Sequence, residues 1–202
     1  MFYRTKHLLS LIYNDKTFYD NDLFDIIKST ENKFIEEVYN YEFFKKSINQ
    51  SIPNKFEYIK QLNIFRKHLT GGISELLKLN IIANNSTHIF SSHFYLNDIL
   101  SPHRLVIKDI DSTIFYNNIP SQETYYYCVR KSLIENLDDI EYALYGFGNL
   151  LIDIFDFGKE IKLFDLYNLV KKEFENDDDV LNDVFITFLS ENFVKNYSII
   201  IC

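Results

Sequence analysis

The chain has 202 residues, of which 47% are hydrophobic and 25% charged, a composition that excludes a disordered protein and is typical of a folded one. Its formal net charge of −8 argues against a non-specific nucleic-acid binder and permits a basic peptide as partner. Without an apolar run of about 18 residues or a convincing signal peptide, we expect no membrane span and a cytoplasmic protein.

The beginning of the chain carries helical patterns. Leu8–Tyr13 and Leu23–Lys28 predict two short helices. Apolar residues then recur at three- and four-residue steps between residues 31 and 49, which predicts a longer helix with one apolar face.

A second long apolar stripe runs from Phe56 to Leu76 and predicts another helix. Gly71 and Gly72 lie inside this stripe and should weaken or kink the helix, because each glycine costs about 1 kcal/mol relative to alanine. We therefore predict a helical domain over residues 1–100, with a boundary near Ser101-Pro102.

The second half begins with three short runs of the β type. They cover Leu105–Ile110, Thr113–Asn117 and Thr124–Arg130, and turn signals separate them. Three short strands at this point of the chain predict a small three-stranded sheet.

Three amphipathic helical stripes follow these runs. They lie over residues 138–158, residues 163–174 and Val180–Phe193, before an apolar tail at Tyr197–Ile201. Strands followed by helices in this order predict a winged-helix-like domain over residues 101–202. The expected fold class is therefore α+β, with a helical N-terminal domain followed by this domain of three strands and three helices.

Winged-helix domains bind either a nucleic-acid groove or a peptide at the edge of the sheet. The last predicted helix, Val180–Phe193, contains neither Lys nor Arg, and three aspartates precede it. A helix that reads DNA supplies basic and amide side chains to bases and phosphates. These residues favour a peptide and argue against nucleic acid.

The third predicted strand is the expected peptide site. An open strand edge exposes N–H and C=O groups with which an extended peptide can pair. Side chains alternate along a strand, so one of two sets faces the helices, and the sequence leaves both sets open. The sets are Tyr125, Tyr127 and Val129, or Tyr126 and Cys128; Phe185 and Phe188 of the last helix would line the groove beside them, although each aromatic is also a normal core residue.

The titratable residues form no recognisable catalytic or metal-binding pattern. His88, His93 and His103 lack the spacing of metal ligands, and Cys128 has no basic neighbour that would activate it. The acidic run at 173–179 lacks the alternating ligands of a calcium loop. We expect no catalytic site, no metal and no cofactor in this chain.

The segment Leu62–Gly72, with the sequence LNIFRKHLTGG, resembles a helix motif of small partner proteins of multinuclear iron oxidases. The expected order of the second half resembles the precursor-recognition element of pathways that modify ribosomally made peptides. Together these features resemble the family of methanobactin-biosynthesis partner proteins.

This resemblance implies a non-catalytic accessory subunit. Such a subunit forms a heterodimer with an iron-dependent oxidase, which holds the iron, and binds the leader region of the precursor peptide that the oxidase modifies. The alternatives are a winged-helix transcription regulator and an acidic interaction or immunity protein. The resemblance implies leader contacts at Tyr125, Tyr127, Val129, Phe185 and Phe188, and a structural or partner-interface role for Arg66 and His68.

Overall fold

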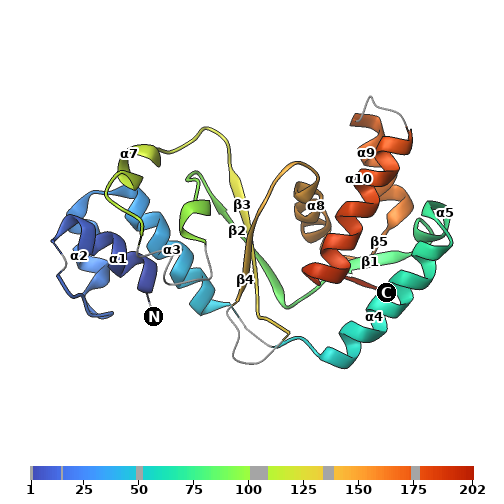
Figure 1. Ribbon diagram of the computed structural model, residues 1–202, viewed down its shortest axis with the longest axis horizontal. Coiled ribbons are helices and arrows are strands. Elements are labelled where there is room, and N and C mark those ends of the chain that lie inside the picture. Colours follow the sequence, from blue (N-terminus) through green and yellow to red (C-terminus); the bar gives the residue numbers. More distant parts are fainter. Residues whose placement is uncertain (1, 15, 49–51, 101–108, 134–138, 174–177) are drawn as a thin grey trace. The chain divides into compact units, whose positions relative to one another are not determined.

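The protein is described here from a computed structural model that covers residues 2–14, 16–48, 52–100, 109–133, 139–173 and 178–202 (Figure 1). It is a mixed α+β protein, and it divides into two compact units. Each unit takes segments from both halves of the chain, whereas the sequence predicts one boundary near residue 101. Unit 1 comprises Met1–Asn49, His88–Val129 and Asp139–Ala143, and unit 2 comprises Gln50–Thr87, Arg130–Asp138 and Leu144–Cys202.

Helices dominate unit 1, and two of them are capped by polar side chains. The Asn32 side chain accepts hydrogen bonds from the N–H groups of Phe34 and Ile35 at the start of α3. The start of α1 has no cap of its own, and Glu42 of α3 accepts both the Arg4 and the Thr5 N–H at 3.0 Å. The helices are α1 (Tyr3–Ile12), α2 (Leu23–Thr30), α3 (Lys33–Ser47), the short 3₁₀ turn η1 (Asn97–Ile99) and α7 (Ile114–Asn117).

A three-stranded sheet completes unit 1. It contains β2 (Thr87–Ser92), β3 (Tyr125–Arg130) and β4 (Ile140–Leu144) in the order β2-β3-β4, so β3 has a neighbour on each side. The core packs apolar side chains of α1, α2 and α3 together with Tyr127 and Val129 of β3. Burial of this apolar face is the main force that stabilises the unit.

Unit 2 combines helices with a second antiparallel sheet. Its strands are β1 (Asn80–Ala83), β5 (Ile161–Lys162) and β6 (Ile199–Ile201), in the order β5-β1-β6. The helical elements are α4 (Lys55–Thr70), α5 (Ile73–Leu76), η2 (Gly146–Asn149), α8 (Leu150–Phe157), α9 (Leu163–Glu173), α10 (Asp178–Ser190) and the π-helical turn η3 (Glu191–Lys195).

A side chain forms hydrogen bonds with the backbone on the outer edge of β6. The buried Gln61 of α4 accepts a hydrogen bond from the Ile201 N–H at 2.7 Å and donates one to the Ile201 carbonyl at 3.0 Å. Its amide thus offers one donor and one acceptor, as a residue of a neighbouring strand would. In the segment just before β6, the buried Arg130 donates to the carbonyls of Lys195 and Asn196, which end η3.

The predicted helices of the first half are confirmed. The break expected at the glycine pair is also present, because α4 ends at Thr70 and α5 begins after Gly72, whose φ is +84°. Glycine adopts this left-handed region without the steric cost that other residues meet. In the second half, Val180–Phe193 falls on α10 and η3, and the apolar tail contains β6.

The expected order of three strands and then three helices is wrong at two places. The strand predicted at Thr113–Asn117 is helix α7, because the Asp111 carboxylate accepts hydrogen bonds from the Thr113 N–H and hydroxyl and starts a helical turn. The helix predicted over 138–158 begins instead as strand β4 and turns helical only at η2 and α8. Of the strand predicted at Leu105–Ile110, residues 105–108 lie outside the described residues, and Asp109 and Ile110 are not in a strand.

Candidate functional site

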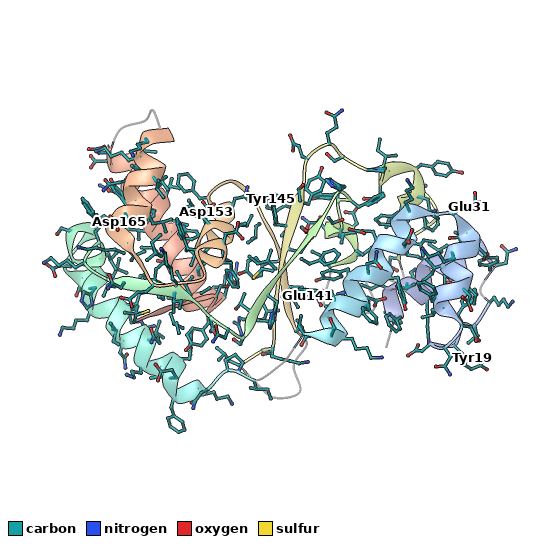
Figure 2. The ribbon with its side chains drawn as sticks, turned by 180° about the vertical axis from the view of Figure 1, so that it is seen from behind. Tyr19, Glu31, Glu141, Tyr145, Asp153 and Asp165 are labelled. Atoms are coloured by element: carbon teal, nitrogen blue, oxygen red, sulfur yellow. The ribbon has the colours of Figure 1, made fainter. Side chains whose placement is uncertain are left out.

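A groove of about 560 Å³ lies in unit 2 beside the edge strand β5. The end of α8, the segment that leads into β5, β5 itself and one face of α9 form its walls; Asp165 of this face is labelled in Figure 2. The residues that line it are Phe157, Lys159, Glu160, Ile161, Lys162, Asp165, Asn168, Leu169 and Lys172.

The local sequence explains how this groove forms. Gly158 ends α8 in the left-handed region at φ +56°, and its N–H donates to the Phe155 carbonyl at 3.0 Å. The chain then turns back and pairs β5 with β1, with Ile161 opposite Ile81 and Lys162 opposite Asn80. Helix α9 follows at once, and residues 165, 168, 169 and 172 share one of its faces because they are spaced by three and four.

The backbone of β5 directs one N–H donor away from β1. In an antiparallel sheet the N–H and C=O groups of successive residues point alternately to the two sides. The Leu163 N–H donates to the Leu79 carbonyl at 2.9 Å, so Leu163 and Ile161 point toward β1. On the other side of β1, Asn80 accepts from the Cys202 N–H at 3.0 Å. The Lys162 N–H therefore points away from β1, toward the open edge.

The side chains of the groove are cationic and apolar. Lys159, Lys162 and Lys172 line it, and none of them forms an ion pair with a described residue. Two carboxylates are also present, but the Glu160 carboxylate already accepts a hydrogen bond from Asn80. The positive end of the α9 helix dipole lies at the same place, where it favours anions.

Two large apolar side chains in this groove face solvent. Phe157 is 42% exposed and Leu169 is 45% exposed. Backbone, cationic and apolar groups thus occur together in one hollow, and this combination can bind an extended peptide chain. The sequence reasoning missed this groove, because Gly158 after an apolar helix indicates a helix stop but the run Lys159–Lys162 carries no strand pattern.

The peptide edge predicted at β3 is wrong. β3 lies between β2 and β4, so its hydrogen-bonding groups face strands of its own sheet. Tyr127 is fully buried, donates to the Phe94 carbonyl at 2.9 Å and accepts from the Leu96 N–H at 2.8 Å. Val129 is equally buried, and Tyr125 packs its ring against Tyr95 at 5.6 Å. These residues hold the core of unit 1.

The other predicted site residues lie in unit 2, outside the groove. Phe185 and Phe188 of α10 are buried, and the Phe185 ring packs edge-on against Tyr167 at 5.3 Å, which supports the core-packing interpretation. On α4, Arg66 is exposed, and the His68 Nδ1 lies 2.9 Å from the Ile64 carbonyl of its own helix. A partner-interface role for Arg66 and His68 stays a prediction.

A buried ionic cluster in unit 1 was also missed by the sequence reasoning. The Glu141 carboxylate, labelled in Figure 2, contacts Arg4 at 2.8 Å, accepts a hydrogen bond from the Tyr41 hydroxyl at 2.7 Å and pairs with Lys45. Burial alone raises the pKa of Glu141, but Arg4 and Lys45 outweigh it and hold the pKa below its usual value. Burial and the Glu141 charge raise the pKa of Tyr41 well above its usual value, so Tyr41 remains a donor.

Within the described ranges, no group of three or more His, Cys, Asp or Glu side chains is placed to hold a metal ion. Nor does any helix in those ranges combine the length and apolar character needed to cross a membrane. Comparisons of the chain with protein-family models, curated proteins and solved structures give no match.

Proposed function

We propose that the protein is a non-catalytic peptide-binding protein that accepts an extended segment along the outer edge of β5. The observation that carries this proposal is the outward direction of the Lys162 N–H within a groove that also exposes Phe157 and Leu169. A peptide that pairs there extends the β5-β1-β6 sheet by one strand. Main-chain hydrogen bonds supply the affinity, and the side chains of the groove supply the selectivity.

The other sheet edge in unit 2 is a poorer candidate. Gln61 already satisfies both backbone groups of Ile201 on β6. β5 has only two residues and carries a lysine, features that protect an edge against indiscriminate pairing. We therefore expect a weak, selective contact that involves few backbone hydrogen bonds and depends on the groove beside them.

From the resemblance found in the sequence, we propose an identity for two partners of this protein. By this proposal the bound segment is the leader region of a ribosomally made precursor peptide. The second partner is an iron-dependent oxidase that forms a heterodimer with this chain and holds the iron. Binding along β5 needs no winged-helix arrangement, because the end of α8, the segment that leads into β5, β5 itself and α9 form the groove.

The pair of variants Lys162→Pro and Lys162→Ala tests strand addition. Proline lacks the N–H that points toward the peptide, while the β1-facing groups of Ile161 and Leu163 remain available. Both variants lose the lysine charge, so their difference isolates the backbone donor. We expect proline to weaken peptide binding about tenfold more than alanine, since loss of one hydrogen bond costs about 1 kcal/mol and misfit adds to it.

Fluorescence anisotropy with a labelled peptide of about eight residues, alternating valine and glutamate, measures this difference. The Leu163 amide, which donates to the Leu79 carbonyl, must keep the same protection from hydrogen exchange in both variants, which shows that β5 still pairs with β1. Equal affinities of the proline and alanine variants would contradict pairing at β5.

A further inference from the structure

The charge of the β5 groove opposes the charge of the whole chain. The chain carries a formal charge of −8, which by itself favours a basic partner. The groove is lined by three lysines and two carboxylates, so its local formal charge is +1. Local charges inside a hollow determine which ligands concentrate there, because low-dielectric walls focus their field.

We infer that the peptide bound at β5 is acidic, with apolar residues alternating with carboxylates along its length. This inference rests on the proposed function, because alternation has meaning only for an extended strand. Such a strand places all its carboxylates on one face and all its apolar side chains on the other. The groove offers Lys159, Lys162 and Lys172 to the carboxylates, and Phe157 and Leu169 to the apolar side chains.

The negative charge of Asp165 gives a further test of this inference, because its removal should increase the affinity for an acidic peptide. It lies in the first turn of α9 and lines the groove beside the lysines. A bound acidic peptide meets repulsion from this carboxylate. We therefore expect Asp165→Asn to tighten the binding of an acidic peptide, whereas loss of the lysines weakens it.

Two peptides of about eight residues separate charge recognition from strand addition. One alternates valine with glutamate, and the other alternates valine with threonine, which has a high strand propensity and no charge. We expect the glutamate peptide to bind the unaltered protein about tenfold more tightly. Each exposed lysine–carboxylate contact contributes a factor of about two to five.

The variant Lys159→Gln/Lys172→Gln should remove most of this preference. Lys162 is left intact, so the backbone donor is not altered. Lys55→Gln is the control, because Lys55 is an exposed lysine of unit 2 on α4 that does not line the groove. We expect the double variant to bind the glutamate peptide about tenfold more weakly and the threonine peptide with unchanged affinity. The control should bind both peptides as the unaltered protein does.

Ionic strength gives a readout that needs no variant. Raising the salt concentration from about 0.01 M to about 1 M shortens the screening length from about 30 Å to about 3 Å. The glutamate peptide should then approach the affinity of the threonine peptide. Amide hydrogen bonds are little affected by the same change.

The outcomes distinguish the two proposals. Equal binding of both peptides, with both weakened by N-methylation of alternate peptide bonds, overturns the acidic preference and leaves strand addition standing. Binding that ignores N-methylation and Lys162→Pro overturns strand addition, even when the lysines matter. If neither peptide binds, both proposals fail.

Discussion

Glu141 is a buried carboxylate that contacts three side chains of unit 1. It joins β4 to α1 through Arg4 and to α3 through Tyr41 and Lys45, and its side chain is only 5% exposed. A buried ion pair is seldom better than a well-packed apolar pair, but removal of one partner leaves an uncompensated charge. The cluster therefore specifies how β4 packs against the helices rather than adding a large net stability.

The lowered pKa of Glu141 predicts an acid-sensitive fold. In the unfolded chain the pKa of this carboxyl is about 4.3. Because the folded pKa lies below this value, the contribution of Glu141 is fully present above the unfolded pKa and is lost as pH falls through the folded pKa. Glu141→Gln should lower the free energy of unfolding by about 3 kcal/mol at pH 7 and by less near pH 3.

Urea unfolding at both pH values measures this change. Glu123→Gln is the control, because Glu123 is an exposed carboxylate of unit 1. Glu123→Gln should change the free energy of unfolding by no more than about 0.5 kcal/mol at either pH. A destabilisation by Glu141→Gln that is the same at both pH values would show that charge plays no part.

For single residues, burial could be predicted from the sequence, but distant hydrogen-bond and ion-pair partners could not. The burial of Cys128 and of Tyr127 was predictable from their residue types in an apolar run. The alternation along 124–130 did not predict that Tyr127 uses its hydroxyl to bridge Phe94 and Leu96. Nor did anything near Glu141 indicate Arg4 as its partner, because the two are far apart in sequence and no local periodicity connects them.

At the scale of the elements, a side chain of α4 satisfies the backbone groups on the outer edge of strand β6. Gln61 serves the Ile201 N–H and carbonyl from α4, and it is 5% exposed. We expect Gln61→Leu to lower the free energy of unfolding by about 2 kcal/mol, because two backbone groups lose their partner in a buried place. Gln61→Glu should cost at least as much, since it keeps the acceptor, loses the donor and buries a charge.

Hydrogen exchange gives a local test of this prediction. The Ile201 amide should lose protection in both Gln61 variants, while amides of unit 1 should keep theirs. Lys60→Leu, at the exposed neighbouring position of α4, serves as the control. Unchanged protection of Ile201 in Gln61→Leu would mean that another group closes the edge of β6.

Elements defined by local periodicity were predictable, and elements defined by distant pairing were not. The stripe at 31–49 and the glycine pair at 71–72 describe α3 and the α4–α5 break, because each signal lies within the element it predicts. β1 and β5 have four and two residues, too few to show a period, and each becomes a strand through its partner. For the same reason, Ile140 and Leu144 predicted a helix face but lie in β4.

At the scale of the whole molecule, the two units are interleaved along the chain. β1 is the central strand of the sheet in unit 2, and its partners β5 and β6 follow from residue 161 onward. In unit 1, Asp139 and Glu141 pair with charged residues that lie before residue 50. A cut at the predicted boundary therefore removes essential parts of both units.

We accordingly predict that fragments 1–100 and 101–202 do not fold alone. Each should give a poorly dispersed proton–nitrogen NMR spectrum, since one fragment lacks β3, β4, β5 and β6 and the other lacks β1 and β2. Mixing the fragments should restore dispersion, because the missing strands are then supplied in trans. A well-dispersed spectrum of either fragment alone would show that the predicted boundary separates independent domains.

Interleaving also has a consequence for synthesis on the ribosome. All segments of unit 1 have been translated once residue 143 has been added, but the sheet of unit 2 waits for Ile201. During that interval the nascent chain carries the apolar faces of α4 and β1 without their partners, and such surfaces attract chaperones and promote aggregation. Slower elongation over residues 144–201 would lengthen this exposure, so the yield of soluble protein in a cell should depend on codon choice in that stretch.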